Sequence, residues 1–244
     1  MVAVYDEIGR GYIQTRSADP RIAAAIASQI GSSRKLLNIG AGAGSYEPEG
    51  RSVLAVEPSM AMISQRPANA APVIQARAEM LPFRNGSFDL AMGILTVHHW
   101  TDLERGLNEA ARAANGNVLL LTWFESIQRY WLEDYFPDMP RFDYARFPPV
   151  ERYREILGDI DLVEVPIPQD CTDGFLCAYW KRPEAYLDPV VRNGISTFSV
   201  IGNLQSGLNR LQSDLETGKW AEKYGDLLSR ESYDCGYRLV RTRG

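Results

Sequence analysis

The sequence LLNIGAGAGS at residues 36–45 decides the fold of this chain, because an apolar run leads directly into three glycines at alternate positions. A short apolar run bounded in this way is typical of a buried β-strand. Gly40, Gly42 and Gly44 permit a sharp turn with positive φ, and without a Cβ they let a ligand approach the backbone closely. We therefore expect a strand followed by a ligand-binding turn.

A second apolar strand, residues 52–56, ends on Glu57. An acidic residue at this point can accept hydrogen bonds from the two hydroxyls of a ribose. A dinucleotide fingerprint requires glycine at its first, third and sixth positions, but Ser45 stands at the sixth. The two strands predict a nucleoside cofactor across the carboxyl ends of parallel strands, with a spacing that fits a nicotinamide dinucleotide poorly.

Two further segments extend this pattern. ARAEMLPF (residues 76–83) and GSFDLAM (residues 86–92) follow the glycine turn and EPSM (residues 57–60). In this order and spacing the chain resembles class I S-adenosylmethionine-dependent methyltransferases, and more narrowly the type 11 small-molecule methyltransferases. The resemblance covers about residues 5–124.

The resemblance implies S-adenosyl-L-methionine as the cofactor and S-adenosyl-L-homocysteine as the product. It implies that Glu57 holds the ribose, while Arg16 folds over the cofactor and meets its carboxylate. An exposed surface arginine is the alternative for Arg16. The positions matched to cofactor binding are Tyr12, Arg16, Gly40, Ala41, Gly42, Glu57, Pro58, Met62, Ala78, Glu79, Leu95 and Thr96.

Strands and helices alternate along the first half of the chain, which predicts a parallel sheet covered on both faces. Strands are expected at 36–39, 52–56, 73–76, 88–95 and 117–122, and helices at 5–14, 21–30, 59–65 and 102–114. The connection from 44 to 52 is too short for a crossover helix and predicts a helical turn or two at most.

Residues 160–166 and 233–242 are the sixth and last predicted strands. The resemblance implies a Rossmann-like, seven-stranded, mostly parallel sheet whose last strand is antiparallel and lies beside the sixth. It also implies a methyltransferase core (residues 1–166 and 232–244) whose helices at 1–31 cover the cofactor. A helical insertion (residues 167–231) would cover the substrate site.

Composition narrows the classes of partner. A net charge of −5 and a pI near 5.2, with no basic block, argue against a nucleic-acid substrate. The two adjacent histidines and three scattered cysteines form no metal-ligand set. No secretory signal and no apolar run of roughly 20 residues is present, so we expect a cytoplasmic chain without a membrane span. Its aromatic region and N-terminal helix could support a homodimer.

His98 and His99, just after the fourth predicted strand, are the candidate catalytic residues. Histidine is the commonest general base, and a base would help methyl transfer to a hydroxyl. In an extended segment the two side chains would point in different directions, so at most one would face the methyl group. The alternative is a packing or capping role, with methyl transfer achieved by positioning alone.

Aromatic residues are concentrated after the fifth strand, where ligands of open α/β sheets bind. An acceptor pocket and ordinary core packing both account for them. The candidate substrate-binding residues are Trp123, Tyr130, Trp131, Phe175, Tyr179 and Trp180.

These features predict an S-adenosylmethionine-dependent methyltransferase that acts on an oxygen, nitrogen or carbon of a small apolar or aromatic metabolite. Two alternatives stay open at this point. One is an NAD-dependent reductase, and the other is a non-catalytic S-adenosylmethionine-binding partner of another protein.

Overall fold

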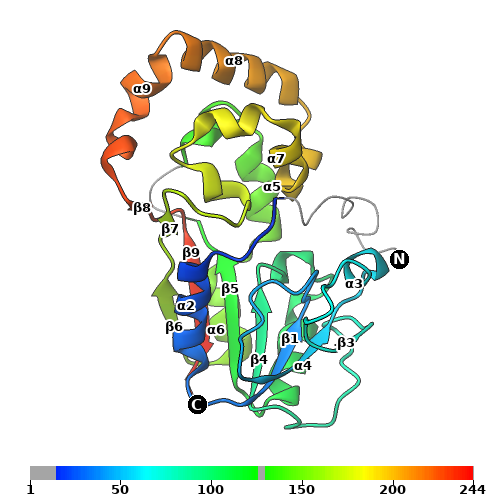
Figure 1. The fold of residues 1–244 in the computed structure, drawn as a ribbon. Coiled ribbons are helices and arrows are strands. Elements are labelled where there is room, and N and C mark those ends of the chain that lie inside the picture. Colours follow the sequence, from blue (N-terminus) through cyan, green and yellow to red (C-terminus); the bar gives the residue numbers. More distant parts are fainter. Residues whose placement is uncertain (1–14, 126–129, 244) are drawn as a thin grey trace.

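The computed structural model describes residues 15–125 and 130–243 (Figure 1). The helix expected at 5–14, and with it Tyr12, lies outside the described residues. Within the described ranges, no helix is both long and apolar enough to cross a lipid bilayer.

The described chain contains one seven-stranded sheet in the order β3-β2-β1-β4-β5-β9-β6. The last strand, β9, is antiparallel to both of its neighbours, and the other pairs are parallel. This confirms the predicted Rossmann-like sheet. The strands are β1 (Lys35–Ile39), β2 (Ser52–Val56), β3 (Val73–Ile74), β4 (Leu90–Ile94), β5 (Val118–Trp123), β6 (Ile160–Glu164) and β9 (Tyr237–Thr242).

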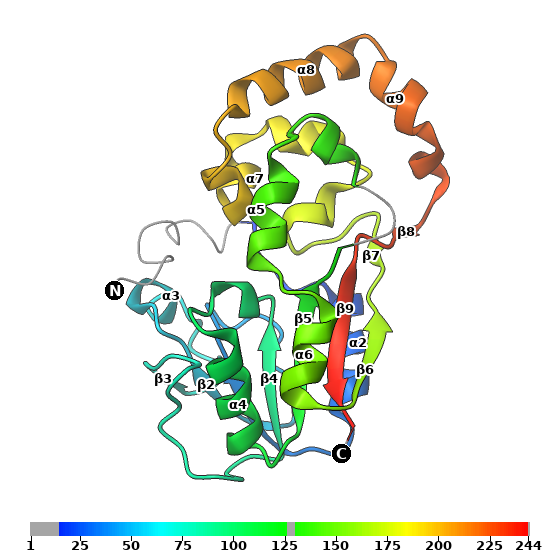
Figure 2. The ribbon, with the colours of Figure 1, turned by 180° about the vertical axis from the view of Figure 1, so that it is seen from behind.

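Helices cover both faces of the sheet. Ile22, Ile26 and Ile30 of α2 (Pro20–Ile30) pack with Leu36 and Leu119 on one face. The other face carries α4 (Leu103–Ala113) and α6 (Val150–Leu157), which are seen together from behind in Figure 2. Neighbouring strand residues alternate between the two cores, because successive side chains of a strand point to opposite faces.

Short polar side chains cap the start of α2, α3 (Met60–Ile63) and α4. The carboxylate of Asp19 accepts a hydrogen bond from Arg21 N at the start of α2, and that of Asp102 accepts one from Arg105 N in α4. Ser59 caps the single turn of α3 in the same way. These side chains satisfy amide groups that have no partner inside the helix. Residues 44–51 form turns without a helix, consistent with the short connection.

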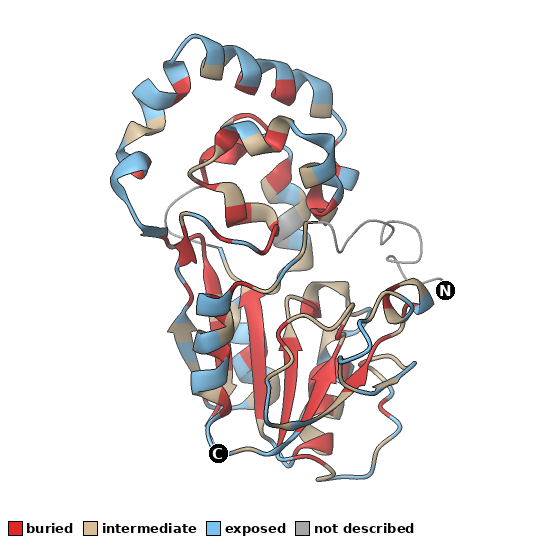
Figure 3. Ribbon diagram, viewed as in Figure 1, coloured by how far each residue is buried: buried red, intermediate tan, exposed pale blue. Residues whose placement is uncertain are grey.

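A second group of helices lies above the carboxyl ends of the strands (Figures 1 and 3). The short strands β7 (Ile167–Pro168) and β8 (Ser232–Tyr233) pair where the chain enters and leaves it. Helices α5 and η3, from the segment before α6, pack there too. The members are η3 (Trp131–Asp134), α5 (Met139–Arg146), η4 (Leu176–Tyr179), η5 (Pro183–Leu187), α7 (Pro189–Asn193), η6 (Ser196–Ser199), α8 (Leu204–Glu216), α9 (Lys219–Tyr224) and η7 (Gly225–Ser229).

Candidate active site

The first cavity opens at the carboxyl ends of β1, β2 and β4. The sequence analysis expected twelve cofactor-binding residues, and every one of them that lies within the described chain lines this cavity. They are Arg16, Gly40, Ala41, Gly42, Glu57, Pro58, Met62, Ala78, Glu79, Leu95 and Thr96. Residues from five separate sequence segments therefore meet around one space.

The glycine turn is tied to the neighbouring strand by its backbone. Gly40 N and Ala41 N both donate to Val56 O, at 2.8 and 3.1 Å. Gly40 has φ +68°, and a Cβ built there would lie 1.9 Å from Oγ1 of Thr96. Glycine is therefore required by both the backbone conformation and the close approach of Thr96. A turn held in this way forms a bare backbone wall of the cavity.

Glu57 is fixed directly beside the glycine turn. Its side chain is buried, and its two oxygens accept hydrogen bonds from Gly42 N at 2.8 Å and Ser59 N at 2.9 Å. These bonds orient the carboxylate between the glycine turn and the start of α3. A carboxylate at the tip of the second strand suits the two hydroxyls of a ribose.

Two side chains of this cavity belong to residues with strained backbones. Tyr46 has φ +61° and Leu95 has φ +52°, and both line the first cavity. A residue other than glycine in this region costs roughly 1–3 kcal/mol, and such residues cluster at functional sites. Hydrogen bonding of Leu95 N to Leu121 O at 2.8 Å holds that conformation at the end of β4.

Arg16 and Tyr46 meet a buried carboxylate above the cavity. Arg16 Nε donates to Oδ1 of Asp173 at 2.5 Å, and the hydroxyl of Tyr46 donates to Oδ2 at 2.9 Å. Asp173 is only 1% exposed, so the arginine neutralises a charge that would otherwise be costly to bury. Sequence reasoning missed this role for Asp173 and Tyr46.

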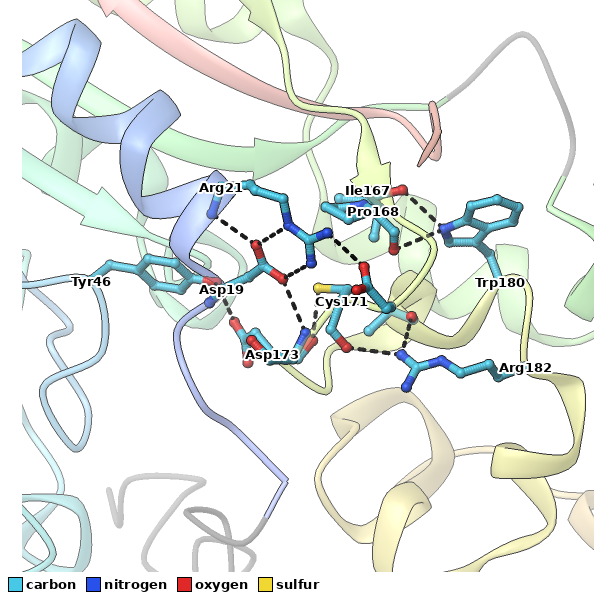
Figure 4. A network of polar contacts seen from close by, with 12 residues as sticks. Asp19, Arg21, Tyr46, Ile167, Pro168, Cys171, Asp173, Trp180 and Arg182 are labelled. Carbon is cyan, nitrogen blue, oxygen red and sulfur yellow. Dashed lines mark hydrogen bonds and ion pairs between the residues drawn. The ribbon is translucent and has the colours of Figure 1, made fainter. Parts of the chain in front are cut away.

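The same network joins α2 to the helical group (Figure 4). The carboxylate of Asp19 accepts from Arg21 Nη2 at 2.7 Å and from Thr172 N at 3.1 Å. Burial alone would raise the pKa of Asp19, but the hydrogen bonds from Arg21 and Thr172 outweigh it and lower the pKa to about 2. One carboxylate thereby caps a helix and fixes the start of the overlying segment.

The two histidines lie on the 3₁₀ helix η2 (Val97–His99) and not on an extended segment, the case that the sequence analysis considered. Their ring centroids are 3.9 Å apart. His99 lines the first cavity, whereas His98 lines a second one. Burial and the positive charges of Arg146 and Arg16 lower the pKa of His99 to about 3. Burial likewise lowers the pKa of His98 far below its usual value.

The second cavity adjoins the first, because Arg16 and Leu95 line both. Two of the expected substrate-binding residues, Trp123 and Phe175, line it together with His98. Sequence reasoning missed its other aromatic and polar members. The additional lining residues are Arg146, Phe147, Leu176, Gly194, Ile195, Ser196, Thr197 and Tyr237.

Four other aromatic residues that the sequence placed at the substrate site line neither of these cavities. Tyr130 shares a hydroxyl–hydroxyl hydrogen bond of 2.6 Å with Tyr186. The indole N–H groups of Trp131 and Trp180 donate to backbone carbonyls inside the helical group, and Tyr179 packs on the ring of Tyr186. These contacts favour the packing alternative for the four side chains.

Residues 37–122 match the family model described as "Methyltransferase domain". A solved structure from Anabaena variabilis, described as a candidate methyltransferase from an antibiotic biosynthesis pathway, is similar over most of its length. It is 34% identical, with a TM-score of 0.87 over 95% of this chain and 100% of that one. No relative was found among curated protein sequences.

Other solved structures share the fold at lower identity. An S-adenosylmethionine-dependent methyltransferase of Thermotoga maritima, a candidate histamine N-methyltransferase, is 22% identical, with a TM-score of 0.53 over 68% of this chain and 86% of that one. A Haemonchus contortus phosphoethanolamine N-methyltransferase, solved with S-adenosylhomocysteine, is 16% identical, with a TM-score of 0.51 over 93% of this chain and 53% of that one.

The fold and the first cavity define a Rossmann-like protein that binds a nucleoside cofactor. The chain belongs to the S-adenosylmethionine-dependent methyltransferases of the type 11 family, and S-adenosylmethionine is its cofactor. The cavity lining fits this group, because it presents a glycine turn without side chains and, hydrogen-bonded to Gly42 N of that turn, the buried carboxylate of Glu57. The resemblance predicted from the sequence is thus confirmed.

Proposed function

We propose that this chain transfers a methyl group to an oxygen, nitrogen or carbon of a small, largely apolar or aromatic molecule bound in the second cavity. The observation that carries the proposal is the contact between the two cavities at Leu95 and Arg16. A cofactor in the first cavity and an acceptor in the second would meet at this boundary.

The first cavity has parts that suit each portion of the cofactor. The glycine turn at Gly40 and Gly42 would lie along the methionine portion, and Glu57 would hold the ribose. Pro58 and Met62 would flank the adenine, whose edge would face Ala78 and Glu79. When bound, the sulfonium of S-adenosylmethionine supplies a methyl group that is already activated.

The chain's own residues then have a limited task. They must align the acceptor atom with the methyl group and exclude water. Leu95, held in a strained conformation at the boundary, and the aromatic rings of Trp123 and Phe175 would do both. We infer that positioning is the main contribution to the rate.

A histidine base has less support than positioning. A general base works best when its pKa lies near the working pH, and the pKa of His99 is about 3. His98 and His99 are therefore neutral at neutral pH and weakly basic. Their proposed role is to form part of the wall between the cavities, with His99 on the cofactor side and His98 on the acceptor side.

Cofactor titration and a transfer assay test the proposal separately. Calorimetric titration with S-adenosylhomocysteine should give saturable binding, and mass spectrometry should detect a methylated product from a panel of small aromatic acceptors. No binding at millimolar concentrations would refute the cofactor site. Binding without transfer to any acceptor would favour the non-catalytic partner, which the family assignment makes the weaker alternative. Size-exclusion chromatography tests the expected homodimer.

A further inference from the structure

The second cavity combines an aromatic lining with a positive charge that has no carboxylate partner among the described residues. Its rings pack against one another: Trp123 and Phe147 have centroids 5.4 Å apart, and those of Phe175 and Tyr237 lie 4.8 Å apart. His98 packs on Phe147 at 4.5 Å. Such a lining suits a planar, apolar molecule, and the few polar groups in it would then set the orientation of that molecule.

Two arginines reach this cavity, and they differ in their partners. Arg16 forms an ion pair with the buried carboxylate of Asp173, so its charge is balanced within the protein. Arg146, at the end of α5, donates from Nη2 to Oγ of Ser196 at 3.3 Å. Among the described residues, no carboxylate lies within ion-pair distance of Arg146. A positive charge thus borders an aromatic cavity without a counter-ion from the described chain.

His98 adds a polar atom but no second charge. Its Nδ1 is buried and has no hydrogen-bond partner in the described part of the chain. Burial and the nearby positive charges keep the pKa of His98 low, so the ring is neutral. A buried polar group without a partner is unfavourable, and a ligand that supplies one removes that cost. Besides Arg16, which is paired with Asp173, the described lining therefore offers the cation of Arg146, the hydroxyl of Ser196 and the unpaired ring nitrogen of His98.

We propose that the acceptor is an aromatic compound carrying an anionic oxygen group, a carboxylate or a phosphate, and that Arg146 and Ser196 bind this group. Arginine suits the task because its planar guanidinium can donate two parallel hydrogen bonds to either anion. The rings of Trp123, Phe147 and Phe175 hold the apolar part, and Nδ1 of His98 bonds to a polar substituent. This inference rests on the proposed function and narrows its substrate class.

Matched ligands test the charge requirement. Phenylacetate, phenyl phosphate and the neutral phenylacetamide are titrated into the protein by calorimetry or ligand-observed NMR, with and without S-adenosylhomocysteine. At least one anion should bind about 10-fold more tightly than the amide, because one charge-assisted contact commonly contributes that much. The better anion identifies the group. Equal binding of all three, or no binding of either anion at millimolar concentrations, overturns the proposal.

Substitution of Arg146 tests the assignment of the contact. Arg146→Gln should abolish the preference for the anion, and Arg146→Lys should keep part of it because the charge remains. Arg154→Gln, on the exposed part of α6, is the matched control and should behave as wild type. A preference for the anion that survives Arg146→Gln overturns the assignment.

The titrations separate this inference from the proposed function. Arg146→Gln should leave the affinity for S-adenosylhomocysteine unchanged, because Arg146 does not line the first cavity. If S-adenosylhomocysteine fails to bind wild type while the anion preference persists, the cofactor site is refuted and the anion site stands. If the cofactor binds and no anion preference exists, only the inference about the acceptor fails.

Discussion

The sheet region (residues 35–123) and the helical group above it build their ligand sites in different ways. In the sheet region, the first cavity comes from strand ends and the turns that follow them directly, such as Gly40 after β1 and Glu57 after β2. The second cavity gathers Trp123, Arg146, Ser196 and Tyr237 from across more than 110 residues. Short motifs therefore define the cofactor site, and long-range packing defines the acceptor site.

The largest effect is expected at the glycine turn. Gly40→Ala would place a Cβ 1.9 Å from Oγ1 of Thr96 in a backbone at φ +68°. Relieving this overlap must move the turn, so the affinity for S-adenosylhomocysteine should fall about 100-fold or more by calorimetry. Gly50→Ala is the control, because Gly50 has φ +70° and no atom near the added Cβ. Equal affinity of both variants for S-adenosylhomocysteine would contradict the proposal that the glycine turn forms part of the cofactor site.

Loss of the charge at Glu57 should have the next largest effect. Glu57→Gln keeps the shape of the side chain but removes its charge, and the new NH2 group cannot accept the hydrogen bond that one Glu57 oxygen receives from Gly42 N or Ser59 N. Cofactor affinity should therefore fall about 10-fold to 100-fold. Part of this loss should disappear when the ligand lacks the ribose 2′-hydroxyl. Glu49→Gln is the control: Glu49 is exposed, and this variant should bind S-adenosylhomocysteine with the affinity of wild type. If Glu57→Gln weakens the binding of S-adenosylhomocysteine and of its 2′-deoxy analogue equally, Glu57 stabilises the structure of the site and does not bind the 2′-hydroxyl.

Asp19, which connects helix α2 on the sheet to Thr172, should make the free energy of unfolding sensitive to acid. The pKa of Asp19 is lowered from 3.8 to about 2 in the folded chain. Its stabilising contribution is fully present above pH 3.8 and is lost as the pH falls from about 4 towards about 2, amounting to about 2 kcal/mol. Urea unfolding should therefore show a smaller loss across this range for Asp19→Asn than for wild type.

Asp170→Asn is the control for that measurement. Asp170 also pairs with Arg21, but its side chain is 70% exposed. An exposed pair contributes little, so this variant should keep the acid sensitivity of wild type. Identical profiles for Asp19→Asn and wild type would show that the link between α2 and Thr172 does not carry the acid response.

The smallest effect is expected at the histidines that separate the cavities. Because the pKa of His99 is about 3, the ring stays neutral above that value. From about pH 6 to about pH 8, the affinity for S-adenosylhomocysteine should change by less than about 2-fold, and His99→Asn should not alter this pH profile. A titration near pH 6.5 that vanishes in the variant would show instead that His99 takes up a proton in the site.

Local sequence patterns were sufficient to predict most of the sheet and most of the residues that line the first cavity. Apolar runs ending in glycine or an acid located Gly40 and Glu57, because the side chain and its partner lie within a few residues of a strand end. The role of Asp173 could not be predicted from the sequence, because its partner Arg16 is 157 residues away along the chain. Arg146 was missed for the same reason, because only the folded helical group brings it to Ser196.

The aromatic region demonstrates the limit of compositional reasoning. Trp131 and Trp180 have the size and position of ligand-binding residues, yet their N–H groups bond to carbonyls within the helical group. Nothing in the sequence separates an indole that bonds to backbone from one that faces a cavity, such as Trp123. The orientation of each indole ring depends on how the short helices pack, and these helices show no repeating sequence pattern from which their packing could be predicted.

The central place of β9 has a consequence for how the chain is made. Residues 237–242 lie between β5 and β6, so neither of these strands can pair with β9 until residues 237–242 have left the ribosome. The earlier strands must wait with an open edge while some seventy residues of the helical group are synthesised. Removing the C-terminal strand should therefore yield nascent chains that engage chaperones and aggregate, even though the segments that build the cofactor site are already complete.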